Sequence, residues 1–290
     1  MVTSVPSSGG GRDPLGPRNP RIGALRRLID RRSERESAGV FVVDGPLLVS
    51  EALASGAVVR ELYCDADHLG DPAIATAVAA ARMSSVRVQI TQPGVIARAA
   101  DPVTPRPLVA VVERPDAPVA SQLRAEGEDS GTAGILVLVG VADPGNVGTL
   151  IRTAEASGMA AVWVVGDGAD PFGPKAVRAS AGSVLRVPIA VQRDGVVAVG
   201  ALSAAGFTVV GTSADGVAYD QLDAGEAPAV LLGSEAHGLD PQVSALVDQW
   251  VSVPMCGLAE SLNVAVAGSV LAFELARRRR IGSGGPGPAR

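Results

Sequence analysis

Three segments in the C-terminal half combine glycine and proline with polar side chains that could do chemistry. They are DPGNVGTLIRTA (residues 143–154), LLGSEAHGL (231–239) and VPMCGLAESLNVAVA (253–267). Glycine lets a backbone come close to a ligand, and proline fixes a turn. The amide, carboxylate, hydroxyl and guanidinium groups in these segments can bind a polar substrate. We therefore treat these three segments as the candidates for a functional site.

The glycine spacing argues against two common nucleotide sites. From Gly140 to Gly148 the chain reads G-x4-G-x2-G, whereas the dinucleotide fingerprint is G-x-G-x-x-G. No G-x4-G-K-[ST] phosphate loop occurs anywhere in the chain. Asp167 ends the next strand as a ribose-binding acid would, but it lacks the accompanying glycines. A dinucleotide-dependent oxidoreductase therefore stays an alternative, although the glycine spacing that would indicate it is missing.

Alternating strands and helices must position the three segments. Residues 134–140, GILVLVG, are apolar throughout, as in a central parallel strand. A helix is predicted over 147–157 and another over Asn263–Arg280. Further strands are predicted at 161–167, 185–191, 207–213, 229–235 and 250–255. This alternation predicts an α/β fold whose parallel sheet is covered on both faces, over residues 134–280.

Residues 19–113 predict a smaller α/β domain. A helix begins at Asn19, with Ile22, Leu25, Leu28 and Ile29 on one face and arginines beside it. Strands at 40–43, 59–65, 86–91 and 108–113 alternate with helices at 47–54 and 71–83. Residues 114–133 lose this periodicity and gain proline, glycine and acid, which is typical of a linker. Residues 1–18 and 281–290 are predicted to be disordered tails.

Composition excludes several classes of protein. The chain has 290 residues, of which 47% are hydrophobic, and a net charge of −5. No apolar run reaches the roughly 18–20 residues of a membrane span, and the N-terminus lacks the apolar core of a secretory signal. Cys64 and Cys256 are too few for a disulfide framework and suit no metal site. We expect a cytoplasmic protein without a metal.

Positive charge is concentrated at the two ends of the chain. Residues 1–40 hold eight arginines against four acidic residues, and residues 277–290 hold five arginines and no acid. Such segregation is a possible footprint for a polyanion, although two solvated tails would give the same pattern. Only 3% of the residues are aromatic, which argues against extensive base stacking on single-stranded nucleic acid.

The three segments together resemble the SPOUT superfamily, specifically the TrmH/SpoU-type RNA ribose 2′-O-methyltransferases. That family reads N-x-G-x-x-x-R, G-x-E-x-x-G and I-P-M-x-G-x-x-x-S-L-N-V-S in this order. The stretch PKAVRASAG (174–182) also looks like the family, and the chain is similar to the thiostrepton-resistance ribosomal RNA methyltransferases. This sequence departs from the pattern at Ala236, Val253 and Ala265.

The resemblance implies more than the pattern alone could predict. It implies a trefoil-knotted C-terminal domain, which is an exception to the rule that chains avoid knots, preceded by a small RNA-binding domain. It also implies S-adenosylmethionine as methyl donor, a homodimer, and an RNA substrate. Ribosomal RNA is our first expectation and transfer RNA the second. A catalytically silent RNA-binding protein is a further alternative, yet the motif residues Arg152 and Asn263 are both present.

Most of the expected site residues follow from matching the motifs to this sequence, and Asn146, Glu235, Ser261 and Asn263 are expected to line one cleft. Thr212 is added because it ends a neighbouring strand, and the RNA contacts are taken from the basic residues. The expected catalytic residues are Arg152, Asn146, Glu235, Ser261 and Asn263. The expected cofactor-binding residues are Thr212, Gly233, Val253, Pro254, Met255 and Leu262. The expected RNA contacts are Arg21, Arg26, Arg27 and Arg178.

Arg152 is expected to clamp the RNA phosphate and stabilise the alkoxide that develops on the ribose. A guanidinium stays protonated at neutral pH, so a role as proton acceptor is less settled. The four-residue spacing places Arg152 on one helix face with Gly148. The alternative to a catalytic role is that Arg152 is a surface arginine that pairs with Glu155, three residues later.

Three further residues have plain structural alternatives. Ser261 could simply cap the last helix. His237 has a side chain suited to a base, but it is expected to be exposed because the motif does not need it. Cys256 is expected to be buried beside the cofactor pocket, without chemistry of its own.

Overall fold

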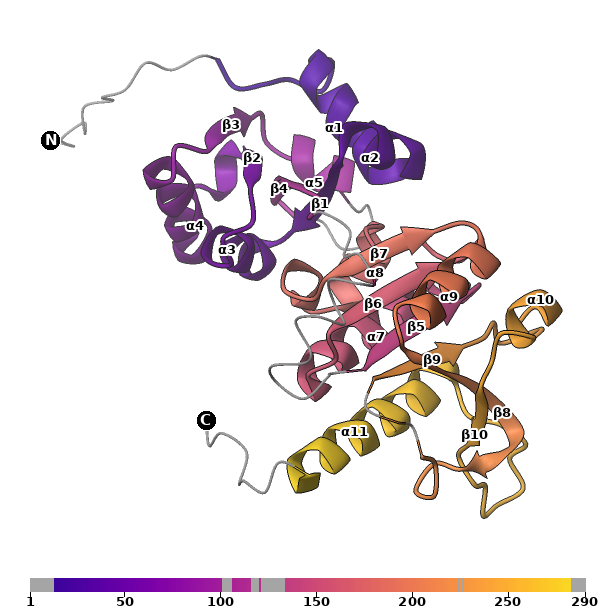
Figure 1. The fold of residues 1–290 in the computed structure, drawn as a ribbon. Helices are drawn as coiled ribbons and strands as arrows, with labels where there is room; N and C mark the ends of the chain where they lie inside the picture. The colour runs from indigo at the N-terminus through magenta and orange to yellow at the C-terminus, as the bar shows by residue number, and fades with distance from the viewer. Residues whose placement is uncertain are drawn as a thin grey trace, which may run out of the picture.

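The computed structural model describes residues 13–100, 106–115, 120, 134–223, 225 and 227–282. Two sheets divide the fold into an N-terminal unit, indigo to magenta in Figure 1, and a larger C-terminal unit. Residues 1–12 and 283–290 of the predicted tails, and most of the predicted linker 114–133, lie outside the described residues. The predicted domain boundaries themselves stay a prediction.

The N-terminal unit contains a mixed four-stranded sheet in the order β1-β4-β2-β3. Strand β4 is antiparallel to β1 and β2, and β3 is parallel to β2. Helices α1 and α5 pack on one face of the sheet, and α3 and α4 on the other. The strands are β1 (Val40–Asp44), β2 (Val59–Asp65), β3 (Arg87–Thr91) and β4 (Leu108–Glu113); the helices are α1 (Pro20–Asp30), α2 (Arg32–Ala38), α3 (Pro46–Ala54), α4 (Pro72–Met83) and α5 (Val95–Ala100).

The arginine-rich segment after Asn19 forms two helices. Asn19 caps α1 through a hydrogen bond from the Arg21 N–H, with Pro20 in the first turn. The chain then turns at Arg31, whose backbone is extended, and α2 begins in a new direction. Arg32, which the sequence placed beside the first helix, therefore belongs to α2.

Part of the predicted N-terminal tail is held against the sheet. The Leu15 N–H donates to the Ile90 carbonyl at 2.9 Å, and the Gln92 N–H donates to the Leu15 carbonyl at 3.0 Å. Leu15 thus pairs with the free edge of β3, and this single bridge anchors the segment that precedes α1.

The C-terminal unit is a six-stranded sheet in the order β10-β8-β9-β5-β6-β7 with every pair parallel. Helices α7, α8 and α11 pack on one face, and α9 and α10 on the other. This confirms the predicted parallel sheet; the trefoil knot stays a prediction. The strands are β5 (Ile135–Val139), β6 (Ala161–Val165), β7 (Ile189–Gln192), β8 (Thr208–Ala218), β9 (Pro228–Leu232) and β10 (Gln249–Ser252); the helices are α7 (Pro144–Ser157), α8 (Pro174–Ala179), α9 (Gly195–Ala204), α10 (Pro241–Ser244) and α11 (Val264–Gly282).

Two element boundaries differ from the prediction in ways that affect the site. Helix α7 begins at Pro144, three residues before the predicted start, because Asp143 caps it and Pro144 suits its first position. Asn146 therefore lies in the first turn of the helix. The strand predicted within 185–191 starts later than expected: Leu185 ends a 3-10 turn that begins at Ser183, and β7 begins at Ile189.

Two glycines let helices pack closely in the C-terminal unit. A Cβ on Gly148 of α7 would lie 2.4 Å from the Ala176 carbonyl oxygen of α8, and a Cβ on Gly268 of α11 would lie 2.5 Å from Leu150. The Thr153 and Ser269 hydroxyls, 2.8 Å apart, add a polar contact between α7 and α11. These contacts fix α7, which contains most of the first segment, and α11, which begins within the third segment.

The arginine run at the end of α11 has structural partners. Arg277 and Arg278 both bind Glu274, and they lower the pKa of that carboxyl to about 2. Arg279 donates to the Ser157 and Gly158 carbonyls at the end of α7. This part of the positive charge therefore stabilises the fold. None of the described helices is long and apolar enough to span a membrane.

Candidate active site

The three predicted segments meet at the carboxyl edge of the parallel sheet. The first segment comes after β5, the second begins at the end of β9 and the third comes after β10. These three strands, together with β8, are consecutive in the sheet in the order β10-β8-β9-β5. The ends of parallel strands share one edge, which is where open α/β sheets bind ligands. Topology thus brings the three segments to one edge of the sheet, whereas the cavity described below is lined from β8, β10, the third segment and α11.

A hydrogen-bonded cluster, which we call the Asn146 cluster (Asn146, Glu235 and Asn263), joins one residue from each segment. The Asn146 amide nitrogen donates to Glu235 Oε1 at 2.7 Å, and the Asn263 amide nitrogen donates to Asn146 Oδ1 at 3.1 Å. Asn146 is half-buried, whereas Glu235 and Asn263 are exposed. The cluster therefore presents carboxylate and amide groups to solvent, where a substrate can reach them.

Helix caps hold this cluster in place. Asp143 accepts the Asn146 N–H at 3.0 Å as the cap of α7, and its other oxygen binds the Lys175 ammonium at 3.0 Å. Hydrogen bonding from Lys175 keeps the pKa of the Asp143 carboxyl below its ordinary value. Asn263 caps α11 by accepting the Ala265 N–H at 2.8 Å. The alternative that Ser261 caps this helix is therefore wrong.

Arg152 lies exposed on α7, the helix that begins at the Asn146 cluster. Gly148, one turn earlier, is buried under α8, so the two residues differ in environment despite their helical spacing. The Glu155 carboxylate accepts hydrogen bonds from Ser183 and Arg186. The Arg152 side chain is thus at the surface of α7, and its role stays a prediction.

A cavity of about 400 Å³ lies between the middle of β8, β10 and the loop that precedes α11. This volume is within the range of small-molecule sites, roughly 300–1,000 Å³. Its walls combine apolar side chains with hydroxyls and one carboxylate. The lining residues are Thr212, Ser213, Ala214, Val251, Val253, Pro254, Met255, Glu260, Ser261, Leu262, Ala267 and Leu271.

The lining includes five of the six residues expected to bind a cofactor, and their roles stay predictions. Gly233 is the exception, since it does not line the cavity. A Cβ there would lie 2.5 Å from the Gly238 carbonyl carbon, so the absence of a side chain lets the two ends of the 233–238 loop pack together. Ser261, expected among the catalytic residues, lines the cavity instead. Thr212 Oγ1 donates to the Leu231 carbonyl at 3.0 Å, which ties the cavity wall to β9.

Several lining residues were not predicted from the sequence. Ala267 and Leu271 are four residues apart on α11, so their spacing alone indicated a shared face. Ser213 and Ala214 simply continue the strand beyond Thr212. Glu260 had no signal, because its position depends on how the 253–263 loop folds back.

The four expected RNA contacts lie in the N-terminal unit and at its boundary with the C-terminal unit. Arg21 pairs with Glu61 at 3.1 Å, and Arg27 lies 3.7 Å from Glu34. Arg26 is half-buried on the same helix. Arg178 pairs at 3.1 Å with Asp44 of the other unit, which gives it a structural partner as well. Their contact with RNA stays a prediction.

The remaining candidates are at the surface. His237 is exposed, as expected, and its backbone N–H donates to Ser234 Oγ at 3.2 Å. Cys256 is also exposed, so the expectation that it is buried is wrong: the loop carrying it runs over the surface. Across the residues that the structure describes, no group of three or more His, Cys, Asp or Glu could hold a metal ion.

Many α/β enzymes have a parallel sheet with a ligand site at its carboxyl edge, and the three motifs at this edge distinguish a SPOUT-type methyltransferase. The SpoU rRNA Methylase family matches residues 133–273, and the MRM3-like substrate binding domain matches residues 19–110. RlmP of Bacillus subtilis (strain 168), a 23S rRNA (guanosine(2553)-2′-O)-methyltransferase, is 32% identical over 86% of this chain and 93% of that protein. The chain belongs to the SpoU rRNA methylase family.

Solved structures agree with this assignment. The SpoU methyltransferase AviRb from Streptomyces viridochromogenes, in complex with AdoMet, superposes with a TM-score of 0.76 at 29% identity, over 90% of this chain and 98% of that one. An AdoMet-bound rRNA methyltransferase from Sinorhizobium meliloti gives a TM-score of 0.75 at 30% identity, over 90% and 95%. The resemblance inferred from the three motifs is confirmed.

Proposed function

We propose that this chain transfers the methyl group of S-adenosylmethionine to a ribose 2′-hydroxyl of ribosomal RNA. The observation that carries the proposal is the Asn146 cluster, which joins the three motif loops beside the cavity lined by the third loop. Ribosomal RNA is favoured over transfer RNA because RlmP, which matches most of this chain, acts on 23S rRNA.

The cavity fits the proposed methyl donor in size and chemistry. Apolar side chains such as Val253 and Leu271 offer walls for an adenine ring, and the Thr212 and Ser261 hydroxyls offer hydrogen bonds. Glu260 brings a negative charge to the same cavity. S-adenosylmethionine, when bound, supplies an electrophilic methyl group on a positively charged sulfonium.

Arg152 is the proposed catalytic residue. A ribose hydroxyl is a weak nucleophile and gains negative charge as its proton leaves. A guanidinium beside it stabilises that charge and can hold the neighbouring phosphate in a bidentate contact. The exposure of Arg152 on α7 supports this role, since an incoming RNA can reach it.

The Asn146 cluster is proposed to orient the ribose. Its donors and acceptors are already fixed by helix caps, so little ordering is needed when substrate arrives. Glu235 is the only ionisable member, and it faces solvent. Ser261 lines the cavity and is proposed to contribute a hydroxyl where donor and acceptor meet.

The N-terminal unit is proposed to capture the RNA through Arg21, Arg26 and Arg27. Each phosphate contact releases counterions, so neutralising Arg26 or Arg27 should lower the salt slope of RNA affinity by about one unit. Arg21 already pairs with Glu61 and should change the slope less. A slope that stays the same in all three variants would exclude them as phosphate contacts.

We further propose a homodimer that works in the cytoplasm. Val266 and Phe273 are seven residues apart on α11 and each is 48% exposed, and Leu258 of the third loop is fully exposed. Apolar groups on one helix face are typical of a surface that a second copy covers. Analytical ultracentrifugation should show two chains, and Phe273→Glu should show one.

Ribose-methylation mapping in cells with and without the gene tests the substrate. We expect one ribosomal RNA nucleotide to lose its 2′-O-methyl group when the gene is deleted and to regain it with the wild-type gene. Loss of a methyl group from a transfer RNA would favour the second candidate. An unchanged methylation map for both RNAs would contradict the proposal.

A further inference from the structure

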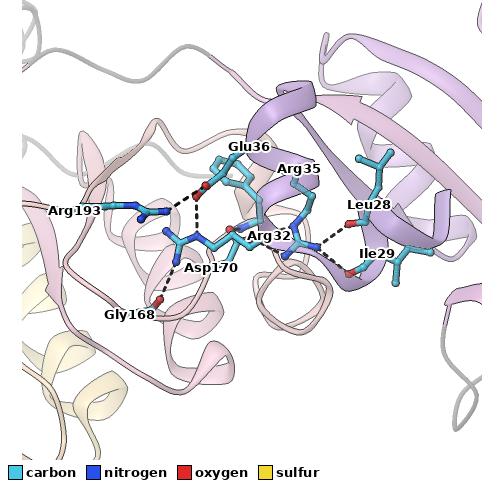
Figure 2. Close-up of polar contacts among 9 residues, drawn as sticks. Leu28, Ile29, Arg32, Arg35, Glu36, Gly168, Asp170 and Arg193 are labelled. Carbon is cyan, nitrogen blue, oxygen red and sulfur yellow. Dashed lines mark hydrogen bonds and ion pairs between the residues drawn. The ribbon is translucent and has the colours of Figure 1, made fainter. Parts of the chain in front are cut away.

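We propose that Arg35 is a positioning residue that fixes the RNA-capturing unit at a set distance from Arg152. The inference rests on the proposed role of the N-terminal unit in RNA capture. Arg35 lies in α2, outside the site described above, and its side chain reaches into the loop between β6 and α8 of the other unit. Figure 2 shows it between the end of α1 and this loop.

All three nitrogens of the Arg35 guanidinium are used. Nε and Nη2 donate to Asp170 Oδ2 at 2.9 and 2.7 Å, and Nη1 donates to the Leu28 and Ile29 carbonyls at 2.7 and 2.9 Å. The Arg35 side chain is 6% exposed and that of Asp170 is 13% exposed. One residue thus joins α1, α2 and the C-terminal unit, in a pair that water barely reaches.

Asp170 in turn shapes the loop it belongs to. Its Oδ1 accepts the Phe172 N–H at 2.9 Å, and its carbonyl accepts the Gly173 N–H just before α8. The buried Phe172 ring lies 5.2 Å from the Phe41 ring of β1, and the Arg114 guanidinium stacks 4.3 Å above it. The Arg35 contact therefore sits beside an apolar and cation–π contact between the same two units.

A second, more exposed set of contacts flanks the Arg35 pair in Figure 2. Arg32 donates to Glu36 at 2.8 Å and to the Gly168 carbonyl at 3.1 Å. Arg193, which follows β7, lies 3.6 Å from Glu36. Helix α2 is thus held to the C-terminal unit at both ends of the 168–170 segment.

The loop that receives Arg35 also contacts Val141, which lies between β5 and the first motif segment. The Ala169 N–H donates to the Val141 carbonyl at 2.9 Å, and a Cβ on Gly168 would lie 2.9 Å from that same oxygen. Lys175, at the start of α8, binds Asp143, the residue that caps α7. A continuous set of contacts therefore runs from α2 to the helix that carries Asn146 and Arg152.

This arrangement favours a positioning role over a purely stabilising one. The two units share one buried apolar cluster, which includes Phe41 of β1 and Phe172 of the β6–α8 loop, and the Arg35 pair adds a directional polar contact to it. Replacing a buried, fully hydrogen-bonded ion pair by apolar residues often costs little stability, so such a pair is weak evidence for a purely stabilising role. Holding the capturing arginines at a fixed separation raises the effective concentration of the target ribose at the site, provided the RNA spans both units.

The test compares a long and a short RNA substrate. A ribosomal RNA fragment can span both units, whereas a short stem-loop around the mapped nucleotide reaches the C-terminal unit alone. We expect Arg35→Gln to lower kcat/KM for the long fragment about tenfold or more, while the short stem-loop and S-adenosylmethionine binding change less than about twofold. Arg60→Gln is the matched control, because Arg60 pairs with Glu113 within one unit at the surface.

The outcomes distinguish a failure of the positioning role from a failure of the proposed function. Equal losses on both RNAs, or no loss on the long one, would overturn the positioning role. No methyl transfer by wild-type protein to either RNA would instead overturn the proposed function. If Arg35→Gln does not fold, Asp170→Asn serves in its place, since it keeps the acceptor for the Phe172 N–H. Small-angle scattering should show a wider distribution of distances between the two units in either variant. An unchanged scattering profile would also contradict the proposal.

Discussion

The Arg35–Asp170 pair and the Asn146 cluster differ in how far water and substrate reach them. Both join segments far apart in sequence: 135 residues separate Arg35 from Asp170, and 117 separate Asn146 from Asn263. The Arg35–Asp170 pair is buried and uses every nitrogen of its guanidinium, whereas Glu235 and Asn263 of the cluster are exposed. The first arrangement suits a fixed joint, and the second leaves polar groups available to a ligand.

Helices α7 and α8 connect these two regions. Helix α8 begins just after the loop that holds Asp170, α7 begins at the Asn146 cluster, and the two helices pack closely at Gly148. A change in one region can therefore reach the other through this helix pair. The variants below separate loss of chemistry from loss of geometry.

Replacing Arg152 should give the largest effect. Arg152→Ala is expected to lower the single-turnover methylation rate about 10²- to 10³-fold, the cost of removing one charge-stabilising donor from an active site. Titration should show unchanged affinity for S-adenosylmethionine, because Arg152 lies outside the cavity lining. The methylation rate of Arg152→Lys should lie between those of the wild type and Arg152→Ala, since lysine keeps the charge but cannot make the bidentate contact. An unchanged single-turnover rate in Arg152→Ala would remove Arg152 from the proposed role.

Gly148→Ala should disturb the packing that joins the two regions. The new methyl group would lie 2.4 Å from the Ala176 carbonyl oxygen. Because that oxygen belongs to the backbone of α8, the clash can be relieved only if α8 moves. We expect a loss of about 1–3 kcal/mol in the free energy of unfolding, measured by denaturant titration. Gly268→Ala is the control, because its close neighbours are leucine side-chain ends that can rotate. Equal losses in both variants would show that α8 is not held rigidly.

Asn263 allows capping to be separated from catalysis. Asn263→Ala removes the cap of α11 and should cost about 0.5–2 kcal/mol of unfolding free energy. Asn263→Asp keeps a capping oxygen but loses the amide donor to Asn146. We therefore expect near wild-type stability and reduced methylation from Asn263→Asp. Full activity in that variant would exclude the donor from any role in orienting the ribose.

Lowering the pH should produce the smallest effect. A hydrogen bond from Arg32 holds the pKa of Glu36 below its ordinary value of 4.5. A lowered pKa stabilises the folded chain above the ordinary value, and this contribution is lost as the pH falls through the folded-state pKa. Melting temperatures should therefore be flat between about pH 5 and 8 and fall below about pH 4.5. Glu36→Gln should show a smaller decrease over the same acidic range, and an identical decrease would assign it to other carboxyls.

Much of the fold and part of the site follow from the sequence. The apolar strand at 134–140 and its alternation with helices predict the parallel sheet, and the three motifs predict that Asn146, Glu235 and Asn263 meet. These contacts are predictable because each residue follows a strand whose carboxyl end reaches the same edge of the sheet. Their roles in binding and catalysis stay predictions.

The contacts between the two units could not be predicted in the same way. Arg32 and Arg35 look like other members of an arginine-rich helix, because periodicity does not distinguish an arginine facing solvent from one facing a distant carboxylate. The turn at Arg31 has no glycine or proline to mark it, yet it separates α1 from α2. The cavity likewise depends on how the 253–263 loop returns, which no local pattern fixes.

The position of the transferred methyl group tests the central claim most directly. Purified protein is incubated with ribosomal RNA and S-adenosylmethionine labelled in the methyl group, and the RNA is digested to nucleosides. We expect the wild-type chain to place label in one 2′-O-methylated nucleoside and Arg152→Ala to place almost none. Label on a base, or equal ribose labelling by both proteins, would contradict the proposed site.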